Sequence, residues 1–265
     1  MRWFSRATDA WSQRERTSGE PGARNGASSF HLVWDLSSHH VIECSAVLEV
    51  VVPPTNSRLY FWALQASFAS GAMVHGGAHL GLQWNTKHPG GGAANWGGYA
   101  SDGSLLLGSE SLLPSTRQDP NTRDYPWMAG HRYRLRIARS GETASGLVAW
   151  RGTVAHIESG EETRIRDLHT KGEYLIRPMV WSEVFARCEH PTVVARWSEL
   201  KAVTAEGVDI HPPYVRVNYQ SRADGGCDNT TAGVDEIGIL QVTNARRRVP
   251  QDAKLPVPGV EAPAS

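Results

Sequence analysis

The chain has 265 residues, of which 40% are apolar and 20% are charged, and its formal net charge is +0. This composition is typical of a soluble globular protein, and a single all-β sandwich of roughly 200–250 residues fits the length. Because no global electric field gathers polyanions, we expect no nucleic-acid partner and no attraction to an anionic membrane. No run of about 18 apolar residues occurs, which excludes a transmembrane helix.

The two ends of the chain differ from its middle. Residues 1–28 mix charge with Gly, Ser and Pro, and they cannot bury enough apolar surface to offset the entropy of ordering. Residues 249–265 contain four prolines and no periodic apolar face. We therefore predict a disordered arm over 1–28, a β-sandwich domain over 29–248 and a disordered tail over 249–265.

The N-terminus and the cysteines bear on the compartment. The first residues lack the apolar segment of a secretory signal, so the sequence as written predicts a cytoplasmic protein. A true start upstream of Met1 leaves secretion open. In a reducing cytosol Cys44, Cys188 and Cys227 are expected to be buried thiols. In a secreted protein, Cys188 and Cys227 are the expected disulfide pair, because both lie in polar, loop-like sequence.

Between the two ends the predicted elements are strands. In residues 131–137 apolar side chains alternate with three arginines, the period of a strand with one buried face, and 79–84 repeats this alternation. The other segments are enriched in Val, Ile, Tyr, Trp and Thr. In chain order, the predicted strands are 30–36, 44–52, 59–68, 79–84, 131–137, 147–157, 163–167, 176–185, 192–197, 215–219 and 234–243.

The connectors carry turn chemistry, for example Ser101-Asp102-Gly103 and Asp224-Gly225-Gly226. Long segments with helical periodicity are absent, although residues 193–203 also permit a turn or two of helix. Many strands separated by turns predict an all-β, two-sheet antiparallel, jelly-roll-like sandwich rather than a parallel α/β sheet.

The order of six segments resembles a known architecture. These segments are YFWALQASF, GGAHLGLQWN, YPWMAGHRYRLRIA, LVAWRGTV, IRPMVWSEVF and VARWSELKAV. Over residues 30–203 they are similar, in pattern, to jelly-roll sandwiches of the concanavalin A/laminin G type and to uncharacterised bacterial domains of that plan. The resemblance implies glycan binding or glycan cleavage. The β-glucanase branch carries three carboxylates on one strand, whereas this chain has only Glu183 there, so that activity is not implied.

The candidate ligand loop is residues 84–99, WNTKHPGGGAANWGGY. Its aromatic faces suit stacking on a sugar, and its amide and imidazole groups suit hydrogen bonds to hydroxyls. The predicted ligand-binding residues are Trp84, Asn85, His88, Asn95, Trp96 and Tyr99. The alternative is that the two tryptophans fill the core while the glycines only turn the chain. A second aromatic group, Tyr125, Trp127 and Tyr133, is expected to hold a loop on the sheet.

Metal-binding candidates are few. Asp224, Asp228 and Asn229 offer spaced oxygen ligands for calcium, but their spacing departs from that of a twelve-residue calcium loop, and a polar turn is the preferred interpretation. The group His75, His79 and His88 lacks a zinc spacing. We expect no metal and no cofactor.

Carboxylates within apolar strands are the catalytic candidates, because desolvation raises a pKa toward general-acid use. They are Glu183, Asp235 and Glu236. Glycoside hydrolysis needs two such groups about 5–10 Å apart across one bond, which sequence alone does not place. Arg132, Arg134 and Arg136 on one strand face are expected to form a solvated ladder paired with acidic neighbours.

Three functions remain open. A glycan-binding module comes first, with an oligo- or polysaccharide as partner. A carbohydrate-active hydrolase or lyase that uses Glu183 and a second carboxylate comes second, and a structural or protein-interaction domain third. The sequence leaves the oligomeric state undetermined.

Overall fold

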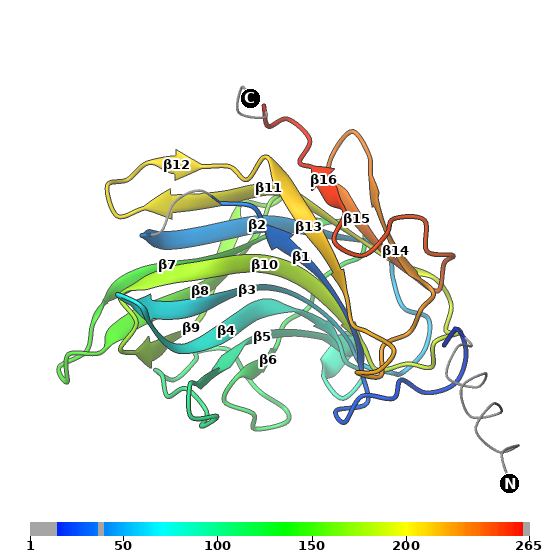
Figure 1. Ribbon diagram of the computed structural model, residues 1–265. Coiled ribbons are helices and arrows are strands. Elements are labelled where there is room, and N and C mark those ends of the chain that lie inside the picture. The colour runs from blue at the N-terminus through cyan, green and yellow to red at the C-terminus, as the bar shows by residue number, and fades with distance from the viewer. Residues whose placement is uncertain (1–14, 37–39, 262–265) are drawn as a thin grey trace, which may run out of the picture.

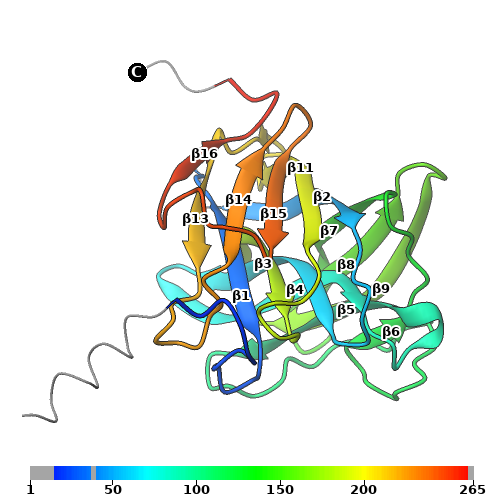
Figure 2. The same cartoon turned by 90° about the vertical axis from the view of Figure 1, so that its right-hand side faces the viewer.

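The computed structural model describes residues 15–36 and 40–261. Over these residues the chain forms sixteen strands and one short 3-10 helix, η1 (Pro89–Gly91). Every strand pairing is antiparallel. The predicted all-β, antiparallel, jelly-roll-like sandwich is therefore confirmed, and Figures 1 and 2 show its layers.

The first sheet is built around β2 and β11, and the short strand β12 (Asp209–Ile210) pairs beside β11. On one side of these two strands, β11 pairs with β15 and β15 pairs with β14. On the other side, β2 pairs with β7, β7 with β8, and β8 with β9. In spatial order its long strands are β14 (Thr230–Val234), β15 (Ile239–Thr243), β11 (Val193–Thr204), β2 (Val41–Val52), β7 (Arg132–Glu142), β8 (Val148–His156) and β9 (Glu161–Thr170).

The second sheet is built around β10 and β3. It meets the first sheet at one corner, where Leu175 of β10 pairs with Val41 of β2. In spatial order its strands are β16 (Lys254–Pro256), β13 (Tyr214–Tyr219), β1 (Ser28–Trp34), β10 (Tyr174–Val184), β3 (Tyr60–Ser70), β4 (Met73–Trp84), β5 (Gly92–Ala100) and β6 (Thr122–Asp124).

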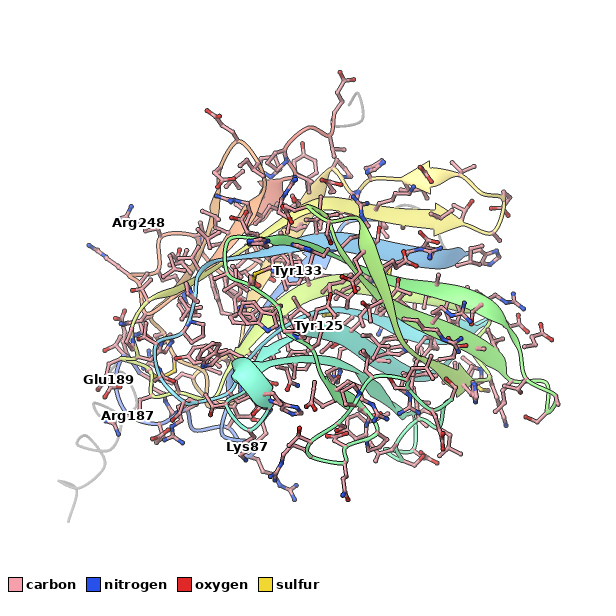
Figure 3. All side chains as sticks on the ribbon, turned by 180° about the vertical axis from the view of Figure 1, so that it is seen from behind. Lys87, Tyr125, Tyr133, Arg187, Glu189 and Arg248 are labelled. Atoms are coloured by element: carbon pink, nitrogen blue, oxygen red, sulfur yellow. A yellow bond between two sulfur atoms is a disulfide. The ribbon has the colours of Figure 1, made fainter. Side chains whose placement is uncertain are left out.

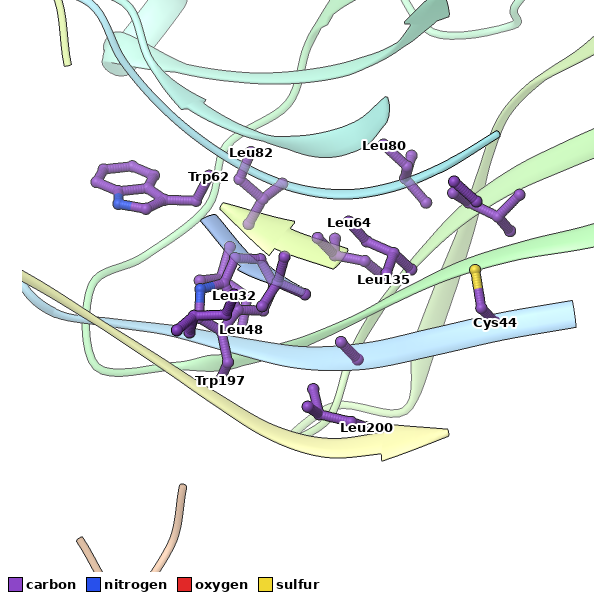
Figure 4. Close-up of a cluster of buried hydrophobic side chains, with 14 of the residues drawn as sticks. Leu32, Cys44, Leu48, Trp62, Leu64, Leu80, Leu82, Leu135, Trp197 and Leu200 are labelled. Carbon is purple, nitrogen blue, oxygen red and sulfur yellow. The ribbon is translucent and has the colours of Figure 1, made fainter. Parts of the chain in front are cut away.

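The core lies between the two sheets. Alternate residues of each strand point inward, so Trp62 of β3 and Leu82 of β4 face Leu48 of β2 and Trp197 of β11 (Figure 4). Full burial of each such side chain contributes on the order of 1.5–3 kcal/mol. In the described part of the chain no tryptophan is exposed, and most of them belong to this core.

Three predicted elements change in the structure. The glycine-rich segment 84–99, interpreted as a loop, forms β5 over its second half. The predicted strand 234–243 is broken by a turn between β14 and β15, at Asp235. Residues 193–203, which also permitted helix, lie in β11, where a register shift between Ser198 and Lys201 interrupts the strand alternation.

The predicted domain boundaries also change. Residues 1–14 and 262–265 of the predicted arm and tail lie outside the described residues, but the rest of both segments packs on the sandwich. The Arg16 backbone N–H donates to Asp228 Oδ2 (2.6 Å), and Gly22 N–H donates to the Gly225 carbonyl (2.8 Å). Lys254–Pro256 forms β16 against β13. The sandwich therefore extends beyond 29–248, because long-range backbone pairing replaces the missing apolar periodicity.

Cys188 and Cys227 form a disulfide with a Cα–Cα distance of 5.6 Å, whereas Cys44 is a free, buried thiol. The expectation of three thiols is thus wrong for Cys188 and Cys227, and the pairing expected for a secreted protein is the one observed. Burial raises the pKa of the Cys44 thiol and keeps it protonated. Disulfides persist in oxidising compartments.

The revised boundaries can be tested by comparing a chain of residues 15–261 with one of residues 29–248. The shorter chain loses the Asp228 and Gly225 contacts and β16, so we expect its melting temperature to fall by roughly 5–10 °C. Differential scanning calorimetry measures the difference. Coincident melting of the two chains would restore the boundaries predicted from the sequence.

Candidate functional site

The predicted ligand loop does not form a sugar platform. Trp96 is 0% exposed, and its indole Nε1 donates to the Trp150 carbonyl inside the core (3.1 Å). Trp84 packs against the core, and its Nε1 donates to the Asn56 carbonyl (2.7 Å). The alternative interpretation, in which both tryptophans are structural, is therefore correct.

The polar members of the loop are also engaged in structure. His88 is buried, and its Nδ1 lies 2.6 Å from Asp124 Oδ1. The buried Asn95 donates from Nδ2 to Thr122 Oγ1 (2.8 Å). Tyr99 is 55% exposed at the end of β5, apart from these groups. Asn85 contacts Gln83, which lies on the same face of the second sheet as Asn95. The six predicted residues do not converge on one ligand.

The core role of Trp96 predicts a large loss of stability in Trp96→Ala. The indole packs directly against the backbone of Gly152, where a Cβ would lie 2.7 Å from the ring, so the site cannot close easily after truncation. We expect the free energy of unfolding to fall by about 3–5 kcal/mol. Chemical denaturation measures this loss; a stability change below about 1 kcal/mol would contradict the buried position.

The other predicted groups of aromatic and basic residues are structural. Tyr125 and Tyr133 are buried neighbours (Figure 3), and Trp127 Nε1 donates to the Gln83 carbonyl (2.8 Å), which holds its loop on the sheet. The predicted arginine ladder is paired as expected. Its ion pairs are Arg132 with Glu158, Arg134 with Glu199 and Arg136 with Glu43.

The acidic turn at 224–229 does not gather ligands for a metal. Asp228 Oδ2 accepts from Arg222 Nε (2.9 Å) and from the Arg16 backbone, while Asp224 accepts from Ser221 Oγ (2.5 Å). Asn229 donates from Nδ2 to the Cys188 carbonyl (2.8 Å). Hydrogen bonds within the protein therefore occupy these groups, in agreement with the polar-turn interpretation.

The three catalytic candidates lie on different sheets. Asp235 and the exposed Glu236 belong to the turn between β14 and β15 of the first sheet, and Asp235 Oδ2 pairs with Arg196 (2.8 Å). Burial would raise the pKa of Asp235, but hydrogen bonds from Gly238 and Arg196 outweigh it and hold that pKa below its usual value. Glu183 lies on β10 of the second sheet. The expected pair of catalytic carboxylates does not form.

Glu183 instead belongs to the outer face of the second sheet. We use this name for the side chains that alternate with the core residues along each strand and point away from the core. Strand register places neighbouring residues of this face in rows. One row runs through Glu183, Phe61, Gln83, Ala93 and Asp124, from β10 to β6. The adjacent row runs through His31, Trp181, Ala63, Gly81 and Asn95. We take this surface as the candidate site.

The Glu183 carboxyl is half-buried on this face. Its Oε1 accepts from Asn25 Nδ2 (2.9 Å) and lies 3.4 Å from Ser29 Oγ. Burial raises the pKa of Glu183 above its ordinary value, and the two hydrogen bonds offset only part of the effect. A neighbouring negative charge is not the cause. Glu183 is therefore a carboxyl group that can take up and release a proton closer to neutral pH.

Aromatic rings and neutral histidines surround the centre of the outer face. The rings of Phe61 and Trp181 meet edge to face, with 4.9 Å between their centroids. The centroid of the His79 ring lies 5.5 Å from that of Phe61 and 5.6 Å from that of Trp181. Burial lowers the pKa of His79 to about 4. Burial also lowers the pKa of His31, against a smaller opposing effect of a hydrogen bond to the Asn218 backbone. Burial thus favours the neutral form of both His31 and His79.

Two carboxamides complete the outer face. Gln65 Oε1 accepts from Trp181 Nε1 (2.9 Å), and Gln83 Oε1 accepts from Asn85 Nδ2 (3.2 Å). Each amide oxygen already accepts a hydrogen bond within the protein. The N–H groups of the two amides are the donors that a ligand can use. Gln83 shares the row of Glu183, two strands away, or about 10 Å between strand axes.

An open cavity of about 580 Å³ lies beside Glu183. Ser29, which contacts the Glu183 carboxyl, forms part of its wall together with His31, Asn218, Gln220 and Arg247. His31 Nδ1 is buried and has no hydrogen-bond partner among the described protein atoms. The cavity therefore adjoins His31 and also Ser29, which contacts the Glu183 carboxyl.

Sequence reasoning selected Glu183 but missed most of its surroundings. His31, Phe61, Gln65, Gln83 and Trp181 were not singled out as site residues. Within each strand they occupy the positions that alternate with core residues. The period-two pattern of the sequence therefore indicates that these side chains point away from the core. The pattern did not contain the strand order that brings β1, β10, β3 and β4 together.

The raised pKa of Glu183 predicts a pH-dependent stability difference for Glu183→Gln. Folding favours the neutral carboxyl, so its contribution to stability is fully present below the unfolded-state pKa and is lost as pH rises through the raised folded-state pKa. The amide stays neutral at every pH. Urea denaturation should therefore give equal stabilities at low pH and a more stable variant at neutral pH; the opposite order would show that the carboxylate is favoured.

Comparison with known proteins gives distant structural likeness only. No family model and no curated protein matches the chain. Scytalido-glutamic peptidase bound to a peptide-based transition-state analog is 7% identical, with a TM-score of 0.46, covering 86% of this chain and 99% of that chain. SCP-B, a member of the eqolisin family of peptidases in complex with the tripeptide Ala-Ile-His, is 8% identical, with a TM-score of 0.45 and the same coverage.

The bacteriophage CBA120 tailspike protein 2 enzymatically active domain is 15% identical, with a TM-score of 0.29, covering 73% of this chain and 24% of that chain. The β-sandwich itself follows from the strand pairings described above. The narrower concanavalin A/laminin G resemblance stays a prediction. Among the described residues, no helix has the length and apolar character needed to cross a membrane.

Proposed function

We propose that the protein is a hydrolase that cleaves acyl bonds of the peptide or amide type, with Glu183 as general acid–base. The observation that supports this most is the half-buried Glu183 carboxyl, whose pKa is raised by burial, in one row with the carboxamide of Gln83. The proposal rests on this outer face and not on the distant fold likeness.

The chemistry uses two groups on either side of a bound carbonyl. The ionised Glu183 carboxylate takes a proton from a water molecule as the water oxygen attacks the carbonyl carbon. The Gln83 amide donates a hydrogen bond to the oxygen that becomes negatively charged. Glu183 then returns the proton to the departing nitrogen, and the carbon–nitrogen bond breaks. Glu183 and Gln83 are two strands apart, about 10 Å between strand axes, with the largely buried Phe61 between them, so a bound substrate would span from β10 to β4 over Phe61.

The composition of the outer face favours acyl bonds over glycosidic bonds. Glycoside hydrolysis ordinarily needs two carboxyl groups about 5–10 Å apart. In the row of Glu183, the other carboxyl among the described residues is Asp124, four strands away, at about 19 Å. Asp124 is also hydrogen-bonded to His88 and Thr116. Acyl hydrolysis by water needs one proton-transfer group and one oxyanion donor, which Glu183 and Gln83 supply.

Glycan binding is the second candidate, now at the cavity of about 580 Å³ rather than at residues 84–99. Its wall includes Ser29, Asn218, Gln220, Gln251 and Arg247, whose hydroxyl, amide and guanidinium groups match the hydroxyls of an oligo- or polysaccharide. The concanavalin A/laminin G resemblance points to the same ligand class. The absence of nucleic-acid and membrane partners stays a prediction from the neutral charge.

We also propose an oxidising compartment for the protein, contrary to the cytoplasmic expectation. The proposal is supported by the Cys188–Cys227 disulfide, because the reducing cytosol disfavours such bonds.

The catalytic proposal predicts the effects of two substitutions. Digestion of a mixed peptide library by the native protein, followed by mass spectrometry between pH 3 and 7, should give discrete cleavage products. Glu183→Gln keeps the size of the side chain but cannot transfer the proton, so we expect cleavage to fall at least 100-fold. Gln83→Ala removes the oxyanion donor and should lower kcat by about 100-fold.

Glu162→Gln is the matched control, because Glu162 is an exposed strand glutamate on the first sheet and should not alter cleavage. No cleavage of any peptide, combined with binding on a glycan array, would replace the hydrolase with the glycan-binding candidate. Failure of both assays would favour a structural or protein-interaction domain.

A further inference from the structure

Three potential metal ligands meet at one edge of the first sheet, away from Glu183. His131 precedes β7, His156 ends β8, and Glu158 lies in the turn between β8 and β9. His131 Nδ1 is 2.9 Å from His156 Nε2, and that nitrogen is 3.2 Å from Glu158 Oε2. All three ligand atoms lie within 4.8 Å of one another, and among the described residues no other group of three His, Cys, Asp or Glu does so.

The β7–β8 pairing brings this cluster together. Tyr133 of β7 pairs with His156 of β8, which places the residue before β7 beside the turn after β8. The ring of Tyr133 stacks on that of His156, with 5.0 Å between the ring centroids and 23° between the ring planes. The imidazole positions are therefore fixed by the hairpin rather than by a flexible loop.

Neighbouring side chains orient two of the ligands. His156 Nδ1 lies 2.8 Å from Ser159 Oγ, and when Nδ1 carries the proton in this bond, the Nε2 lone pair points to the cluster. Glu158 Oε1 accepts from Arg132 Nε (3.0 Å), while Oε2 accepts from the Arg132 backbone N–H (3.1 Å) and lies 3.2 Å from His156 Nε2. Such partners fix the tautomer of a ligating histidine and the direction of a ligating carboxylate in metal sites.

We propose that His131, His156 and Glu158 bind one divalent transition-metal ion of the zinc type. Two imidazoles and one carboxylate are ligands that suit zinc and leave a fourth position open to water. Zinc–nitrogen distances of about 2.0–2.1 Å in a tetrahedral site separate two nitrogens by about 3.3 Å. Opening the observed 2.9 Å contact by a few tenths of an ångström therefore admits the ion.

Binding moves one proton within the cluster. Without the ion, the contact between His131 and His156 needs one hydrogen, carried on His131 Nδ1 when His156 Nδ1 donates to Ser159. With the ion, both facing nitrogens offer lone pairs, so His131 carries its proton on Nε2 instead. The ring remains neutral, and the metal replaces the hydrogen bond that joined the two rings.

Isothermal titration of the chelator-treated full chain with Zn²⁺ tests the site. The native protein should bind one ion per chain, and its melting temperature should rise with Zn²⁺ concentration, since the ion binds the folded state. Co²⁺ in place of Zn²⁺ should give the visible absorption of a four-coordinate site. His131→Gln, His156→Gln and Glu158→Gln should each weaken Zn²⁺ binding at least tenfold.

Two further variants separate this site from general histidine binding. His75→Gln removes a histidine on β4 and should leave the affinity unchanged. Ser159→Ala removes the hydrogen bond that orients His156 and should weaken binding about tenfold while the ligands remain. If His156→Gln loses stability without metal, the Glu158→Gln result decides, because that side chain is partly exposed and keeps its size. Absence of saturable binding, or equal affinity in all three ligand variants, would overturn the proposal.

Discussion

The alternation of side chains along β3 and β10 is the constraint on which the rest of the structure depends. Trp62 and Leu64 point into the core, and the residues between and beside them, Phe61 and Gln65, must point outward. A slip of one residue would move the indole of Trp62 to the outer face and a carboxamide into the core. The energy of core burial therefore also fixes the groups of the outer face around Glu183.

Glu183 shows how the pKa of a carboxyl group is raised by burial without a charged partner. Strand β10 holds Glu183 on the outer face. The segment before β1 contributes to the burial of the carboxyl, because Asn25 lies against it and donates a hydrogen bond to it. The same segment pairs with the turn at Gly225, near the Cys188–Cys227 disulfide. A hydrogen bond from a residue far along the chain thus offsets part of the effect that burial has on the pKa of Glu183. The cluster of His131, His156 and Glu158 depends on the β7–β8 hairpin instead.

Composition was a poor guide to which aromatic residues face a ligand. The Gly-Ala-Ala-Asn-Trp sequence of β5 suggests a loop, but the small residues are required there by close packing. A Cβ on Gly97 would lie 2.7 Å from the Asn121 side chain, and one on Gly98 would lie 2.2 Å from the Gly77 carbonyl. The same tight packing encloses Trp96, so flanking glycines marked a crowded strand and not an open platform.

The sequence by itself determined the all-β class, most strand positions, the paired arginines at 132–136 and the place of Glu183 within an apolar strand. These are local properties, because period two and turn residues act within a few positions of the chain. Only the tertiary structure decided that Asp235 stands on the other sheet, that Phe61 and Gln83 share the row of Glu183, and that Asn25 hydrogen-bonds to the Glu183 carboxyl. Strand order and burial depend on pairings between distant residues, and no local pattern specifies them.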